Sequence, residues 1–218
     1  GAKFAFIGLS SSAAALASNP LYLNILNLVM TDGGLYFKNA FPANSRIVVD
    51  SMTLTVTKRL VMCDQSEPYS TSAMAICHTT LSLLKGTSYI ITNATMGGPW
   101  PAASTTTPNN NIFLMTFYGA TTISTGSTWV LDKSSTNTRC FIIHIHSTAF
   151  TVTTSSTFIV RNSDLQCDRF CISSEGGGSV TDLSGYLTIS DHSAFVIDSV
   201  TAYVPLNEIG EDLFAMMN

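Results

Sequence analysis

The chain has 218 residues, a formal net charge of −4 and only 11% charged residues, whereas an ordinary soluble domain carries about 25%. Its 27 serines and 28 threonines supply the missing polarity. The acidic balance and scattered basic residues argue against strong nucleic-acid binding, and no apolar run approaches the roughly 20 residues of a membrane-spanning helix. Since so little charge offers little repulsion between copies, we expect the protein to assemble with copies of itself or with sibling subunits.

Residues 1–33 differ from the rest of the chain and predict an apolar N-terminal arm that contains a short helix. Asn19 suits a helix N-cap and Pro20 suits the first helical position. Apolar residues then recur at helical spacing. Such an arm packs under the body or onto another subunit, and the alternative is an ordinary buried helix within one domain. The residues expected at an interface are Phe4, Phe6, Leu21, Ile25 and Leu28.

From residue 34 to residue 206, apolar and polar residues alternate with a period of two, which predicts β-strands. The expected strands lie near residues 35–39, 46–60, 73–84, 88–93, 111–118, 127–132, 139–152, 157–161, 185–190 and 194–204. No helical segments separate these strands, so the crossover helices of a parallel sheet are missing. We therefore predict an all-β fold, an antiparallel two-sheet sandwich or jelly roll, with no internal repeat.

Residues 207–218 form a short C-terminal tail in which apolar residues follow several acidic ones. The spacing predicts an amphipathic helical turn that docks on the body or on a neighbouring subunit. The residues expected at that contact are Leu213, Phe214 and Met216.

No residue constellation specifies a reaction, and we predict a protein that is not an enzyme and holds no cofactor or metal. His144 and His146 are the candidate metal ligands, because residues two apart on a strand face the same way. They are similar to the His-x-His of cupins, but no acidic residue follows them closely. Cys167 and Cys171 lack the second cysteine pair of a zinc site. Free thiols and a loop disulfide both remain open for them.

Trp100 lies among prolines in a stretch rich in glycine and asparagine, residues 97–111. A tryptophan in such a loop is a candidate ligand or receptor contact, or a lid over the end of a sandwich. A carbohydrate-binding module would combine it with Trp129 and Tyr118.

The body, residues 35–204, resembles the jelly-roll subunits of small non-enveloped, picornavirus-like capsids. The threonine-alternating strand 46–60, the long strands in 139–161, the terminal strand 194–204 and the apolar ends carry this resemblance. It implies a structural subunit that packs into a virus shell and is located in the virion, and a start at Gly1 would fit release from a polyprotein. The chain lacks the basic arm of many simple capsid proteins.

Two alternatives remain open at this point. One is an extracellular or cell-surface filament or adhesin subunit whose terminal segment completes a neighbour's sheet. The other is a carbohydrate-binding β-sandwich module.

Overall fold

The computed structural model describes eleven segments of the chain, and the account below is confined to them. They are residues 3–8, 19–31, 33–55, 73–97, 112–118, 120–138, 141–146, 149–167, 172–174, 187–203 and 214–216. All of the elements in these segments are β-strands. The predicted tail residue Leu213 and the loop residue Trp100 lie outside the described residues.

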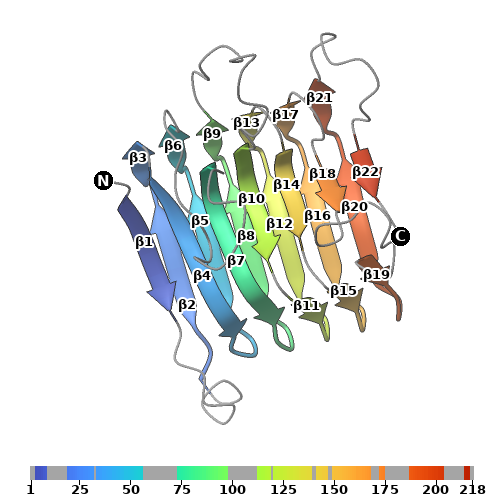
Figure 1. The fold of residues 1–218 in the computed structure, drawn as a ribbon. Helices are drawn as coiled ribbons and strands as arrows, with labels where there is room; N and C mark the ends of the chain where they lie inside the picture. Colours follow the sequence, from blue (N-terminus) through green and yellow to red (C-terminus); the bar gives the residue numbers. More distant parts are fainter. Residues whose placement is uncertain are drawn as a thin grey trace.

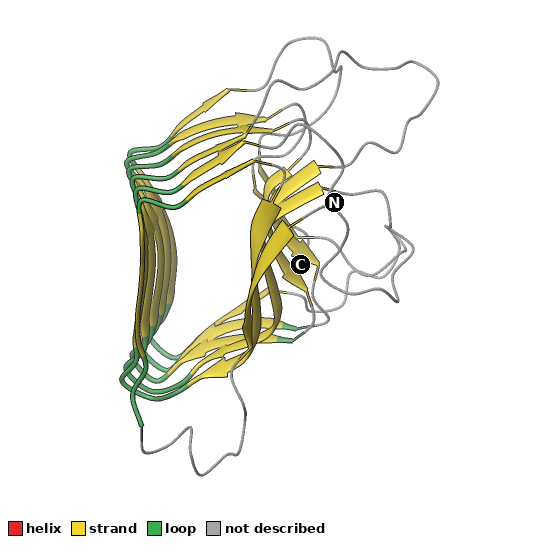
Figure 2. Cartoon of the chain, turned by 90° about the vertical axis from the view of Figure 1, so that its left-hand side faces the viewer, coloured by secondary structure: helices red, strands yellow, loops and turns green. Residues whose placement is uncertain are grey.

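The chain winds repeatedly about one axis, and its strands stack into three parallel sheets, called A, B and C below. This arrangement is a parallel β-helix (Figures 1 and 2). Each turn of the winding, called a coil below, passes through sheet A, then sheet B, then sheet C, and returns to sheet A one layer further on. Viewed along the axis, the strands of successive coils lie behind one another on each side (Figure 2). Side chains fill the interior.

Sheets B and C have six strands each and run along the whole length of the β-helix. The strands of sheet B are β2 (Tyr22–Leu26), β5 (Arg46–Asp50), β8 (Ser88–Thr92), β12 (Thr128–Asp132), β16 (Thr157–Arg161) and β20 (Ala194–Asp198). The strands of sheet C are β3 (Val29–Thr31), β6 (Thr53–Thr55), β9 (Thr95–Gly97), β13 (Ser135–Thr138), β17 (Asp164–Cys167) and β21 (Thr201–Tyr203).

Sheet A has ten strands and is less regular, because some coils contribute two short strands to it and others one long strand. Its strands are β1 (Lys3–Gly8), β4 (Gly33–Phe41), β7 (Ala73–Leu83), β10 (Ile112–Tyr118), β11 (Thr121–Ser124), β14 (Phe141–His146), β15 (Phe150–Thr153), β18 (Ile172–Ser174), β19 (Leu187–Ile189) and β22 (Phe214–Met216). The longest, β7, pairs with β4 on one side and with both β10 and β11 on the other.

The predicted antiparallel sandwich is wrong, because each strand pairing in the described residues is parallel. Several predicted strands are present, among them β8, β12 and β16. The continuous strands expected at 46–60 and 194–204 are wrong, because a corner divides the first into β5 and β6 and the second into β20 and β21, which lie in different sheets. Crossover helices are one way to bring a chain back parallel to itself, but a β-helix does so by closing a full coil through two further sheets. The missing helices therefore did not exclude parallel pairing.

The predicted N-terminal helix is also wrong. Residues Tyr22–Leu26 form β2 and Val29–Thr31 form β3, and the described part of the chain contains no helix. Leu23 and Ile25 point inward while Tyr22 and Leu26 are exposed, as expected for strand alternation. The domain boundaries predicted at residues 33 and 206 are not tested by these strands.

One residue with a positive φ turns the chain from sheet B into sheet C in each coil. These residues are Asn27, Ser51, Asn93, Lys133, Asn162 and Ser199, with φ between 49° and 56°. Asparagine adopts this left-handed conformation more readily than most residues. The N–H of Asn27 donates to the Asp50 carbonyl at 3.0 Å, and the N–H of Asn162 donates to the Asp198 carbonyl at 3.0 Å. The ladder of hydrogen bonds therefore continues through the corner.

Aromatic rings form a stack inside the β-helix along sheet B. Trp129 lies on Phe158 with ring centroids 4.2 Å apart, and Phe158 lies on Phe195 at 4.6 Å. Tyr89 meets Trp129 edge-on at 6.3 Å. These residues occupy matching register positions on successive coils. The repeated side chain at one position of each coil therefore builds a continuous core along the axis.

Hydroxyl groups form a second internal row at the corner between sheets A and B. Ser45, Thr87, Ser127 and Ser156 precede their sheet B strands, and each is at most 1% exposed. The N–H of Thr87 donates to Ser127 Oγ at 3.1 Å, and the N–H of Ser156 donates to Ser193 Oγ at 3.0 Å. Buried backbone groups at the corner thereby obtain partners.

Candidate assembly interface

The first coil leaves an apolar interior surface partly open at one end of the β-helix. In sheet B, β2 pairs with β5 on one side, and no described strand lies on its other side. Its inward-facing side chains are half-buried, whereas their register partners Ile47 and Val49 on the next coil are both 0% exposed. The half-buried inward residues of the first coil are Leu21, Leu23, Ile25, Leu28 and Met30.

In sheets B and C the last coil is open in the same way at the opposite end, whereas in sheet A β22 pairs with β18 one layer further on. Within the described residues β20 pairs only with β16, and β21 pairs only with β17. Ile197 is 40% exposed, whereas its partner Val160 on the preceding coil is 0% exposed. The half-buried inward residues of this coil are Leu187, Phe195, Val200 and Ala202. Exposed strands of this kind are templates for further pairing.

A carboxylate at the end of a sheet B strand is bonded by the asparagine at the corner of the next coil. Asn93 donates from Nδ2 to Asp50 at 2.8 Å, and Asn162 donates from Nδ2 to Asp132 at 2.9 Å. The hydrogen bonds from Asn93 and Ser51 hold the pKa of Asp50 below its ordinary value. The same Asp–Asn contact therefore recurs along one corner of the β-helix.

Asp132 also forms an ion pair with Arg161, whose Nη2 lies 3.0 Å from Asp132 Oδ2. Partial burial acts to raise the pKa of Asp132, but hydrogen bonds from Asn162 and Arg161 outweigh it and hold the pKa below its ordinary value. At the end of the last coil, Asp198 is bonded by the neighbouring Ser199 hydroxyl at 3.1 Å. No asparagine of a following coil faces Asp198 within the described residues.

The apolar residues predicted at interfaces lie in the terminal coils, although not in arms or helices. Leu21, Ile25 and Leu28 pack against the core of the first coil. Phe4 and Phe6 lie on β1, and Phe214 and Met216 lie on β22, which are edge strands at opposite ends of sheet A. The structure thus groups them at opposite ends of the β-helix, and their contacts with other chains stay a prediction.

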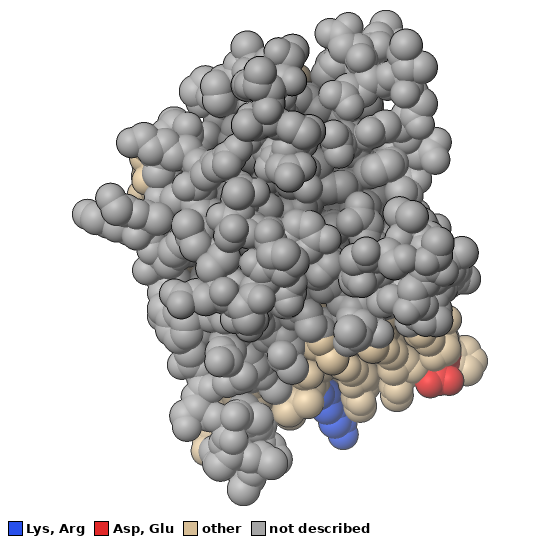
Figure 3. Space-filling view, in the orientation of Figure 1, with Lys and Arg blue, Asp and Glu red and all other residues tan. Residues whose placement is uncertain are grey.

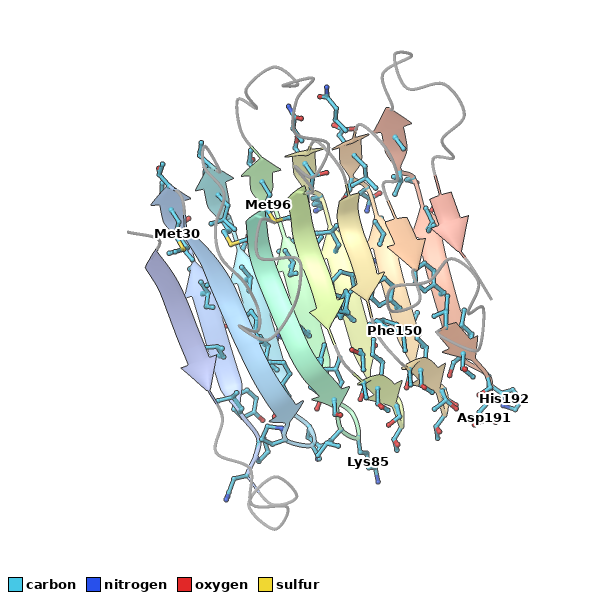
Figure 4. The ribbon with its side chains drawn as sticks, viewed as in Figure 1. Met30, Lys85, Met96, Phe150, Asp191 and His192 are labelled. Carbon is cyan, nitrogen blue, oxygen red and sulfur yellow. The ribbon has the colours of Figure 1, made fainter. Side chains whose placement is uncertain are left out.

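The described residues provide no metal centre. No group of three or more histidine, cysteine, aspartate or glutamate side chains comes together among them. His144 and His146 lie two apart on β14, between β10 and β18. Asp191 and His192 lie at the exposed corner of the last coil and project away from the body (Figure 4). Cys167 ends β17, whereas Cys171 is outside the described residues.

The proposed sugar-stacking surface is not formed by Trp129, because this side chain is 0% exposed and lies in the internal aromatic stack. Tyr118 ends β10, at the register position opposite His146 of β14. Most of the described surface in the view of Figure 3 is uncharged, with a basic and an acidic group at its lower edge. Its low charge agrees with the composition.

Comparison with known protein families decides the family of this chain. Residues 1–164 match the family described as the DGF-1 beta-sheet domain. The chain belongs to this family. No curated protein and no solved structure matches it. The DGF-1 β-sheet domain match ends at the first residue of β17, and the parallel β-helix continues beyond it through β20 and β21.

Family membership supports a β-sheet protein, but the structure contradicts the jelly-roll fold on which the resemblance to picornavirus-like capsid subunits depended. Among the described residues no helix is long and apolar enough to cross a membrane.

The sequence signal that was missed is a repeated ten-residue unit. Each unit consists of one sheet B strand, a corner and one sheet C strand. It recurs at residues 22–31, 46–55, 88–97, 128–137, 157–166 and 194–203.

Proposed function

We propose that this DGF-1 β-sheet domain is a structural assembly module, a non-catalytic length of β-helix that joins further β-helical coils through its two terminal coils. One observation carries the proposal: inward-facing side chains that are fully buried in the middle coils are half-exposed at both ends. Burying apolar surface contributes about 25 cal/mol per Å². A further coil at either end would therefore extend the core.

The low charge of the chain supports the same role. With 11% charged residues and a net charge of −4, two copies repel each other weakly. Strands are held in parallel pairs by uncharged backbone groups, so adding a coil does not require desolvating many ions.

A virus shell and an extracellular filament were the two settings predicted for an assembling protein. The β-helix favours the filament, because its two ends are different surfaces. Contacts between unlike surfaces that do not close into a ring generate open, linear assemblies. A location in the virion and a location at the cell surface both stay predictions.

Sedimentation velocity over a concentration series, combined with hydrogen exchange, tests the proposal. We expect species larger than the 23.3 kDa monomer as concentration rises, with new amide protection concentrated in β2, β3, β20 and β21. A chain that stays monomeric at every concentration would contradict the proposed function, and so would assembly that protects only strands in the middle of the β-helix.

A further inference from the structure

We propose that the first coil is covered by the first coil of a second copy, with the β2 strands of the two copies paired antiparallel across a two-fold axis at Asn24. In this register Asn24 lies opposite Asn24 of the second copy, and Tyr22 lies opposite Leu26 of the second copy. The inference rests on the proposed function, and it specifies the partner and the register of one of the two ends.

The first coil ends the β-helix in a single layer, which allows contact with an equivalent surface. β1, β2 and β3 are end strands of sheets A, B and C, and each pairs with the second coil. Within the described residues no strand lies beyond them. At the other end β22 lies one layer beyond β20 and β21. A second copy can therefore meet β2 without displacing a described strand of either copy.

The open backbone groups of β2 match one another in this register. The N–H of Asn27 donates to the Asp50 carbonyl at 3.0 Å. Since alternate residues of a parallel strand bond the same neighbour, the odd-numbered residues of β2 face β5, whereas Tyr22, Asn24 and Leu26 direct their N–H and C=O groups to the open side. An antiparallel pairing centred on Asn24 lets all three exchange hydrogen bonds with the second copy. A shift of the register by two residues in either direction leaves one of them without a β2 partner.

The outer residues at the two ends of β2 differ from those at the same positions of the following coils. Tyr22 is 72% exposed and Leu26 is 58% exposed, and both have large apolar surfaces. The following coils carry mostly polar residues at these two positions, namely Arg46 and Asp50, Ser88 and Thr92, Thr128 and Asp132, Thr157 and Arg161, and Ala194 and Asp198. Antiparallel pairing places Tyr22 of each copy against Leu26 of the other. It therefore covers the large apolar residues that only this coil carries at these positions.

The middle outward position of sheet B shows the reverse pattern. It holds an aliphatic residue in every following coil, and the row consists of Val48, Ile90, Val130, Ile159 and Val196. In the first coil it holds Asn24, which is exposed. A carboxamide both donates and accepts hydrogen bonds, so two Asn24 side chains that lie opposite each other at the two-fold axis can bond one another. The polar centre and its apolar flanks thus select one register.

The interior and the charge of β2 also permit contact between two equal surfaces. Leu23 lies opposite Ile25 of the second copy in this register, and both are half-buried inward residues, so the core continues into the second copy. No residue of β2 or β3 is charged, so these strands set no like charges against each other. The joint closes on itself, and a longer assembly grows from the two last coils that the pair leaves at its ends.

Cysteine pairing tests the register directly. In an Asn24→Cys variant the two introduced thiols lie opposite each other, and the roughly 5.5 Å between the Cα atoms of such a pair is within disulfide range. We expect mild oxidation to give a dimer whose 24–24 link is identified by mass spectrometry. A mixture of Tyr22→Cys with Leu26→Cys should give a 22–26 link. Tyr22→Cys alone is the register control, and Ile90→Cys, at the position of Asn24 in a middle coil, is the surface control; neither should link to itself.

Replacement of the exposed apolar residues provides the second measurement. The double variant Tyr22→Ser with Leu26→Thr installs the residues that Ser88 and Thr92 supply at the same positions of the third coil. Because both side chains are exposed in a single copy, the urea midpoint of the monomer should stay nearly the same. Self-association in sedimentation velocity should weaken by ~10-fold or more, because each joint loses two apolar pairs. Ser88→Ala is the matched control and should leave self-association unchanged.

The outcomes separate the two proposals. Assembly that protects β2 but gives neither the 24–24 link nor the 22–26 link overturns the two-fold pairing and leaves the structural role intact, with a different chain or a parallel coil as the occupant of this end. Equal linking by Ile90→Cys, or unchanged self-association of the double variant, also overturns the two-fold pairing. A chain that never assembles overturns both proposals.

Discussion

Replacing threonine by valine at two buried positions should change the stability of the β-helix in opposite directions. Thr121 and Thr87 are 0% and 1% exposed, respectively. The Thr121 hydroxyl has no hydrogen-bond partner, whereas the Thr87 hydroxyl donates to the Pro42 carbonyl at 2.7 Å. Valine nearly matches the shape of threonine, so the substitution mainly tests the hydroxyl group.

The expected magnitudes follow from the desolvation of these hydroxyls. A buried polar group without a partner costs about 1–3 kcal/mol, so Thr121→Val should raise the free energy of unfolding by about 1 kcal/mol or more. Thr87→Val removes a made hydrogen bond and should lower that free energy by about 1–3 kcal/mol. A gain of 1 kcal/mol in a chain of this size corresponds to a rise in Tm of roughly 2–4 °C.

Urea unfolding followed by circular dichroism and by tryptophan fluorescence measures both changes. Coincident transitions for the two signals would justify a two-state treatment, and an unchanged m-value would assign the shift to stability. The reasoning about buried hydroxyls would be refuted if Thr121→Val destabilised the protein as much as Thr87→Val does.

Three further predictions concern single positions in the β-helix. Gly97 has φ +148°, and an added Cβ there would collide with a backbone carbonyl of the next coil, so Gly97→Ala should lower the free energy of unfolding by more than about 3 kcal/mol. Gly126 has φ +73° and open space around it, so Gly126→Ala should lower that free energy by about 1 kcal/mol. Urea unfolding compares the two variants. The pKa of Asp132 is lowered in the folded state, so the ionised carboxylate stabilises the fold above about pH 4, and this stabilisation is lost as pH falls through the folded pKa. Asp132→Asn should therefore reduce the pH dependence of Tm in that range. Trp129 makes no hydrogen bond through Nε1, so Trp129→Phe should cost much less than the roughly 3–5 kcal/mol expected for Trp129→Ala, and equal losses would contradict this account of the stack.

The positions of several strands were predictable from the sequence, but their pairing was not. Alternation of apolar and polar residues located β8 and β16 closely. The same alternation occurs in parallel and antiparallel sheets that bury one face, so it does not specify direction. The first residues of the sheet B strands are 24, 42, 40, 29 and 37 residues apart. These unequal intervals hid the repeat of the coils.

The false helix near residue 25 arose from a corner within a strand pattern. Leu23 and Ile25 alternate as in a strand, and after the positive-φ residue Asn27 the inward positions shift to Leu28 and Met30. This shift by one residue places Ile25 and Leu28 three apart, which is also a helical spacing. Comparison with the unit at 46–55, where Ser51 occupies the same corner, would have distinguished the two interpretations.

The many serine and threonine residues have a second role besides contact with neighbouring subunits. The low charge and the many hydroxyl groups of the sequence suggested an assembling surface, but Ser45, Ser127, Ser134 and Ser163 are all at most 3% exposed. Their hydroxyls bond backbone groups at the corners of successive coils, as when the N–H of Ser134 donates to Ser163 Oγ at 3.1 Å. A β-helix needs such partners at every corner. Composition alone therefore supports assembly less than it first suggested, and the open terminal coils carry that inference instead.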